Sequence, residues 1–219
     1  MSTLFKTSLL TLLTSTSLIY SAPPQEFPAT PKASLDRLIT GNERYSKDML
    51  IHPNRSQTRR ESLTETQSPF AVVVGCSDSR VSPTLIFDQD IGDVFEVRLA
   101  GNILGPIGIA SVDFAAKVLG SNLIFVLGHE NCGAVGAVLK GQTEDIEPIA
   151  EKIQQALKSG KKFSDNPLEN AIKANVAFVV KQLREVPFIA KLIKEKKLEV
   201  VGGYYQLQSG KVEICCELP

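Results

Sequence analysis

The sequence predicts a single α/β domain in which a mostly parallel central β-sheet is flanked by helices. Three largely apolar runs, rich in β-branched residues, lie at residues 70–75, 94–99 and 123–127. Strands that are apolar on both faces are typical of a parallel sheet covered by helices. Stretches with helical periodicity lie between and after these runs, which favours one α/β domain.

The composition excludes some classes of partner. The 219-residue chain is 43% hydrophobic and 22% charged, which is ordinary for a soluble globular protein. Its formal net charge is zero, so no overall positive charge argues for binding to nucleic acid or to an anionic lipid surface. We therefore expect no nucleic-acid partner.

Residues 1–22 have the three parts of a secretory signal peptide. Lys6 is positively charged, residues 7–19 are uncharged and largely apolar, and the small residues Ser21 and Ala22 follow. The apolar run is too short for a membrane-spanning helix. We therefore expect an exported protein, periplasmic or secreted, that is cleaved after Ser21 and keeps no stable membrane span after processing. The alternative is an uncleaved anchor or a disordered tail.

The mature chain is predicted to begin with a linker that is followed by one folded domain. Four prolines indicate an extended, Pro-rich linker over residues 23–33, and the domain then covers residues 34–219. Ser34 is placed to cap a first helix that ends near Gly41.

Later elements are indicated by apolar residues that share a helix face and by one turn. A helix closed by Gly120 and two further helices are predicted from three sets: Ile109, Val112, Ala116 and Leu119; Ile146, Ile149, Ile153 and Leu157; and Leu168, Ile172, Val176 and Val179. Residues 198–205 and 211–216 predict a hairpin around Ser209-Gly210.

Polar segments follow the predicted strands and suggest a metal site. Cys76 follows the first strand, and His129 and Cys132 follow the third. Ligands of open α/β sheets bind beyond the carboxyl ends of the strands, so the three residues are expected at one sheet edge. Two thiolates and one imidazole suit zinc, and three protein ligands leave a fourth position for water, as in catalytic sites.

The two cysteines and the histidine also have other interpretations. The cysteines could be inert core thiols, and His129 a hydrogen-bonded loop histidine. A Cys–His nucleophile pair is possible but leaves Cys132 without a role. A phosphate-binding Cys-x5-Arg loop is excluded because the arginine position holds Ser82.

Asp78 and Arg80 flank Ser79 close to the first candidate ligand. Their side chains can point the same way on an extended turn, and an arginine can hold a carboxylate by two parallel hydrogen bonds. The plain alternative is a solvated surface ion pair, which contributes little to stability.

The segments Cys76-Ser-Asp-Ser-Arg80 and His129-x-x-Cys132-Gly133 resemble the β-class carbonic anhydrases. The likeness runs from about residue 35 to about residue 212 and includes the segments at residues 98–102 and 200–205. It implies the parallel-sheet α/β fold of that family and a homodimer or higher homo-oligomer. It also implies one zinc ion per subunit, bound by Cys76, His129 and Cys132.

The resemblance further implies hydration of carbon dioxide to bicarbonate and a proton through zinc-bound hydroxide. Asp78 would accept a hydrogen bond from the hydroxide, and Arg80 would keep Asp78 ionised and oriented. In some members the equivalent aspartate is itself a zinc ligand, so Asp78 is either the orienting group or a fourth metal ligand. Gln67 matches a family glutamine that can bind substrate or bicarbonate, although an exposed loop glutamine is equally consistent.

The sequence also departs from the family pattern. Val73 stands where bicarbonate-regulated members carry tryptophan, and Phe114 stands where tyrosine is frequent. Cys215 and Cys216 are not family ligands; adjacent cysteines would form a strained disulfide, so free thiols or a bond to another chain stay open. Rival functions are hydrolysis of carbon disulfide or carbonyl sulfide on the same fold, and non-catalytic binding of zinc or bicarbonate.

Overall fold

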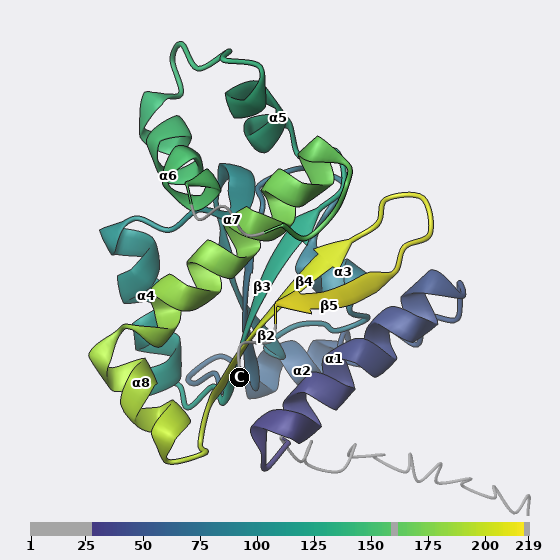
Figure 1. The fold of residues 1–219 in the computed structure, drawn as a ribbon. Coiled ribbons are helices and arrows are strands. Elements are labelled where there is room, and N and C mark those ends of the chain that lie inside the picture. The colour runs from purple at the N-terminus through teal and green to yellow at the C-terminus, as the bar shows by residue number, and fades with distance from the viewer. Residues whose placement is uncertain (1–27, 159–161, 217–219) are drawn as a thin grey trace, which may run out of the picture.

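A computed structural model of the protein describes residues 28–158 and 162–216 (Figure 1). Five strands form one sheet in the order β2-β1-β3-β4-β5. The strands are β1 (Ala71–Gly75), β2 (Val94–Arg98), β3 (Leu123–His129), β4 (Glu199–Tyr205) and β5 (Val212–Cys216). The first four are parallel, and β5 pairs with β4 in the antiparallel sense. The predicted α/β fold and the hairpin near the end of the chain are confirmed. The predicted signal peptide lies outside the described residues.

Helices connect and cover these strands. They are α1 (Pro31–Ser46), α2 (Gln57–Ser62), α3 (Pro83–Ile86), the 3-10 turn η1 (Ala100–Asn102), α4 (Pro106–Lys117), α5 (Gly133–Leu139), α6 (Glu147–Leu157), α7 (Pro167–Arg184) and α8 (Pro187–Lys194). The predicted helices correspond to α1, α4, α6 and α7, while the short helices α2, α3, α5 and α8 were not predicted. Among the described residues, no helix is long and apolar enough to cross a membrane.

Helix α1 begins earlier than predicted. Its N-cap is Thr30, whose side chain accepts a hydrogen bond from the third residue beyond it, and Pro31 occupies the first helical position, which suits its fixed φ angle. The last residues of the predicted linker therefore belong to the helix. Ser34, the predicted cap, is buried inside α1 and donates a hydrogen bond to Asn122.

Helix α1 also ends later than predicted, at Ser46 rather than near Gly41. Gly41 is required by packing and not by helix termination. A Cβ atom at this position would lie 1.8 Å from the carbonyl oxygen of Phe87, so only glycine lets α1 approach the segment after α3 this closely.

The sheet separates two hydrophobic cores. Along β1, Ala71 and Val73 face one core, whereas Val72 and Val74 face the other. Helices α1 and α3 lie on the first side, and α4 and α8 lie on the second (Figure 1). Burying each valine, leucine or isoleucine side chain stabilises the fold by about 1.5–3 kcal/mol.

Parallel pairing brings the ends of β1 and β3 together. Gly75, the last residue of β1, is paired with Leu127 of β3, and β3 continues to His129. On the other side of β1, Gly75 is paired with Arg98, which is followed by η1. The segments after three strands therefore meet at one edge of the sheet.

Candidate metal centre

Three potential metal ligands meet at this edge. Cys76 directly follows β1, His129 is the last residue of β3, and Cys132 is the N-cap of α5. All three residues are buried, and their sulfur and nitrogen atoms lie within 4.8 Å of one another. Tetrahedral zinc with bonds of about 2.0–2.3 Å needs ligand atoms about 3.5–4 Å apart, so small shifts of these side chains suffice.

The ring of His129 is oriented for metal binding. Its Nδ1 lies 2.8 Å from the carbonyl oxygen of Glu130, and a carbonyl can only accept a hydrogen bond. Nδ1 therefore carries the proton, and Nε2 presents its lone pair. Nε2 is buried and has no hydrogen-bond partner among the described residues, which is costly for a polar atom unless a metal occupies its lone pair.

The two sulfurs strongly affect each other's protonation. Hydrogen bonding from Cys132 lowers the pKa of Cys76 to about 4, although burial opposes the shift. The same contact, together with burial, raises the pKa of Cys132. Without a metal the pair thus holds one negative charge, because a second buried thiolate beside the first is unfavourable. A divalent cation between the sulfurs would permit both to ionise.

Backbone N–H groups point at both sulfurs and favour their thiolate forms. The N–H groups of Asp78 and Gly101 lower the pKa of Cys76, and those of Ala134 and Val135 act in the same direction on Cys132. The donor from Gly101 lies 3.2 Å from the Cys76 sulfur. Two supported thiolates and one neutral imidazole are a donor set that fits zinc.

Asp78 and Arg80 form a two-point ion pair at the mouth of this site. Arg80 Nε lies 2.9 Å from Asp78 Oδ1, and Arg80 Nη2 lies 2.7 Å from Asp78 Oδ2. Hydrogen bonding from Arg80 lowers the pKa of Asp78, so the carboxylate stays ionised. Asp78 Oδ2 is also 3.9 Å from His129 Nε2. The carboxylate therefore borders the space in front of the ligand atoms while it is held by Arg80.

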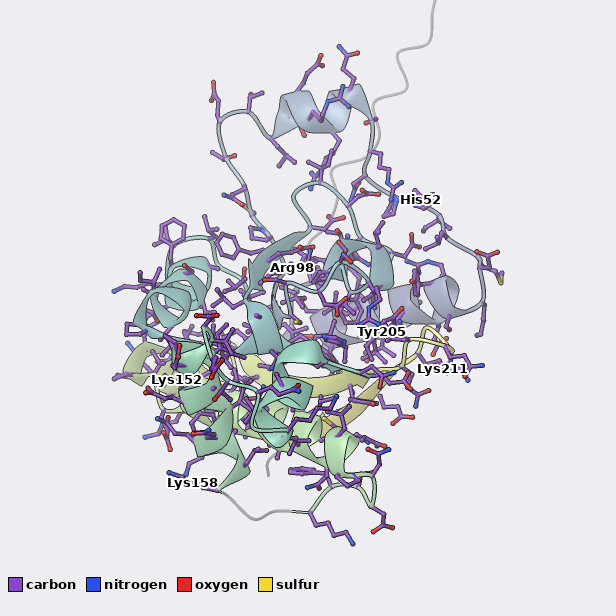
Figure 2. All side chains as sticks on the ribbon, turned by 90° about the horizontal axis from the view of Figure 1, so that it is seen from above. His52, Arg98, Lys152, Lys158, Tyr205 and Lys211 are labelled. Carbon is purple, nitrogen blue, oxygen red and sulfur yellow. The ribbon has the colours of Figure 1, made fainter. Side chains whose placement is uncertain are left out.

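Arg98 supports the loop that carries Cys76 and Asp78. Its Nε donates to the carbonyl oxygen of Cys76 at 3.0 Å, and its Nη2 donates to that of Asp78 at 2.7 Å. Arg98 lies near the middle of the molecule in Figure 2, in contrast to Lys158 at the rim. The sequence resemblance covers its segment but gives Arg98 no role; the signal in the sequence is a charged residue within a largely apolar strand.

Gln67 is not brought to the metal centre of its own chain. It is exposed and lies in the segment before β1, whereas Cys76 follows β1. A strand rises by about 3.3 Å per residue, so the five residues of β1 alone separate the two ends by about 16 Å. Gln67 lines a surface pocket with Leu63 and Ile91 instead.

The positions at which the sequence departs from the resembled family have different environments. Val73 is fully buried within the core beside the sheet, whereas Phe114 on α4 is 46% exposed. Cys215 is half-buried on β5 and does not belong to the cluster of Cys76, His129 and Cys132.

Comparison with known proteins agrees with this site. A family model described as "Carbonic anhydrase" matches residues 71–212. A carbonic anhydrase of Mycolicibacterium smegmatis is 36% identical over 193 residues, which cover 85% of this chain and 94% of that protein. A carbonic anhydrase of Pseudomonas aeruginosa is 33% identical over 190 residues, covering 80% and 85%.

Solved structures are similar over most of the fold. The β-carbonic anhydrase CafA of Aspergillus fumigatus has a TM-score of 0.67 and 26% identity, covering 85% of this chain and 92% of that chain. The β-carbonic anhydrase CcaA has a TM-score of 0.63 and 28% identity, covering 81% and 93%. With the Cys-His-Cys centre on the same fold, the chain belongs to the β-class carbonic anhydrases.

Proposed function

We propose that Asp78, held by Arg80, orients the nucleophile that this enzyme adds to carbon dioxide. The enzyme catalyses the reversible hydration of carbon dioxide to bicarbonate and a proton. Its zinc site is formed by Cys76, His129 and Cys132. The observation that carries the proposal is the ionised Asp78 carboxylate beside Nε2 of His129, which is buried and has no hydrogen-bond partner within the described part of the chain.

The residues around the site have separate tasks. Zinc, when bound, lowers the pKa of water from 15.7 towards about 7 and so supplies hydroxide at neutral pH. Asp78 can only accept hydrogen bonds when ionised, so it would accept the nucleophile's O–H and turn an oxygen lone pair toward carbon dioxide. Arg80 keeps that carboxylate ionised and fixed, and Arg98 holds the backbone of the loop that carries it.

The metal assignment predicts that Cys132→Ser loses zinc and hydration activity together, because a serine hydroxyl is a poor substitute for a thiolate ligand. Zinc content by atomic emission and stopped-flow hydration of carbon dioxide, measured on the same sample, check this. Cys215→Ser is the matched control and should keep both. A Cys132→Ser protein that is metal-free and fully active would refute the assignment.

The proposed role of Asp78 predicts that Asp78→Asn still folds and binds zinc but hydrates carbon dioxide about 10–100-fold more slowly, the usual loss when an orienting group is removed from a metal site. Arg80→Ala should also lower the rate, because Asp78 is then free to leave its position. Stopped-flow rates and zinc content are the measurements.

Asp36→Asn is a matched control for this prediction, because Asp36 forms an exposed ion pair with Lys32 on α1. The control should keep the full rate. If Asp78→Asn and Arg80→Ala also keep it with unchanged zinc content, the pair is only a structural ion pair.

We also propose that two copies associate as a homodimer. Strand β2 is at the edge of the sheet, and α4 with its C-cap residue exposes the large apolar residues Ile107, Phe114 and Val118. Exposed apolar residues grouped in this way are typical of an interaction surface. Within one chain Gln67 precedes β1 and Cys76 follows it, so a role for Gln67 at a metal centre would require the centre of a second copy.

The dimer proposal predicts that Ile107→Glu, which places a charge on the apolar surface of α4, lowers the molar mass of the mature protein in solution. Light scattering after size-exclusion chromatography measures that mass. Gln155→Glu, an exposed substitution on α6, is the control and should leave it unchanged. A wild-type protein that is monomeric at micromolar concentration would contradict the proposal.

Finally, we propose that the protein is exported, supported by the order of Lys6, the apolar run at residues 7–19 and the small residues that follow. The mature protein is then expected to begin near residue 22 or 23 and to lie outside the cytoplasm. Mass spectrometry of the protein from fractionated native cells measures its N-terminus. An intact Met1 on protein from the cytosol would overturn the proposal.

A further inference from the structure

We propose that Asn175, in the middle of α7, is a positioning residue of the zinc site. It acts through Gly101, whose N–H group donates to the sulfur of Cys76. The inference depends on the metal assignment made above but not on the roles of Asp78 and Arg80.

Asn175 is an unusual residue for its position. It is fully buried on a helix whose other buried residues are mostly aliphatic, among them Ile172, Val176 and Val179. Its Oδ1 has no hydrogen-bond partner among the described residues. An unsatisfied buried polar atom destabilises the fold, so stability alone would favour an aliphatic side chain here. The Nδ2 donor of the side chain therefore explains why an asparagine stands at this position.

This donor reaches the segment after β2. Asn175 Nδ2 donates to the carbonyl oxygen of Gly101 at 2.8 Å, a contact between residues 74 positions apart. Both groups are buried. A buried carbonyl needs a partner, and no backbone ladder is available within this short 3-10 turn.

Gly101 has a backbone that is free to adopt other conformations, because glycine has no Cβ atom. Its φ angle is +71° and its ψ angle is 20°, in the left-handed region. Its N–H donates to the Cys76 sulfur at 3.2 Å, while its carbonyl accepts from Asn175. The two hydrogen bonds hold the peptide groups on both sides of one Cα atom. They therefore fix both dihedral angles, and the direction of the N–H follows from them.

Two hydrogen bonds therefore connect α7 to a metal ligand, one from Asn175 to Gly101 and one from Gly101 to Cys76. An N–H donor stabilises the negative charge of a thiolate and limits where the sulfur can move, so it holds Cys76 ready to bind a metal. If Asn175 loses its donor, the carbonyl group of Gly101 is free to turn. The dihedral angles of Gly101 then change, and its N–H group moves away from the Cys76 sulfur. The metal is then bound less tightly, and the charge on the Cys76 sulfur is changed.

The experiment compares Asn175→Leu with Gln182→Leu. Gln182 lies seven residues further along α7, its Nε2 also donates to a loop carbonyl, that of Leu104 at 3.4 Å, and its Oε1 is likewise buried without a partner among the described residues. Both substitutions therefore remove an amide donor from the same helix, but only Asn175 is linked to a zinc ligand. Asn175→Ala is the second variant; it removes the same donor and leaves a small cavity.

Two readouts are used besides activity. One is the zinc dissociation constant, measured by competition with a chromophoric chelator. The other is the thiolate-to-cobalt charge-transfer absorption of the cobalt-substituted protein, which reports the sulfur ligands directly. Asn175→Leu and Asn175→Ala are both expected to bind zinc about 10–100-fold more weakly and to shift the cobalt band. Gln182→Leu should match the wild type in both measurements.

Thermal unfolding of the metal-free proteins separates packing from positioning. If Asn175→Leu does not fold, Asn175→Ala decides by the same two readouts. Wild-type zinc affinity and an unshifted cobalt band in a folded Asn175 variant would overturn the proposal. So would equal changes in Gln182→Leu, or an effect confined to Asn175→Ala, because these would assign the effect to packing. A wild-type protein that binds no zinc would instead refute the metal assignment itself.

Discussion

The site depends on the parallel pairing of β1 with β3. Their register sets Gly75 beside Leu127, so the residue after one strand and the last residue of the other emerge at the same edge. Both strands are buried by helices on two faces, and a shift by one residue would exchange the side chains that pack into the two cores. The position of Cys76 relative to His129 is therefore fixed by core packing, before any metal contributes.

Around this fixed pair, the protein arranges groups that stabilise negative charge. Backbone donors from four residues point at the two sulfurs, and Arg80 pairs with the neighbouring carboxylate of Asp78. Arg98 binds the carbonyl oxygens of the same loop and so holds the Cys76–Asp78 segment from behind. The centre is thus preorganised for a cation by dipoles and ion pairs that belong to the fold, which reduces the reorganisation needed when a metal enters.

Sequence patterns predicted what depends on apolar periodicity and strand order. The β-branched runs located three strands, and their carboxyl ends indicated that Cys76, His129 and Cys132 would meet. The patterns failed where a residue serves a distant contact. Gly41 resembled a helix terminator, but it is needed for the approach of α1 to Phe87. Asn175 and Arg98 could not be assigned roles, because their partners lie 74 and about 20 positions away and only the folded chain shows them.

The separation of the ligands along the chain also affects how the metal is acquired. Cys76 and His129 are more than fifty positions apart, and the crossover between their strands includes β2 and α4. An unfolded chain would have to close that loop to hold zinc with all three ligands, at an entropic cost that no packing offsets. Full zinc affinity therefore arises only once β3 has joined the sheet, so tight binding of the ion marks the completion of the tertiary fold.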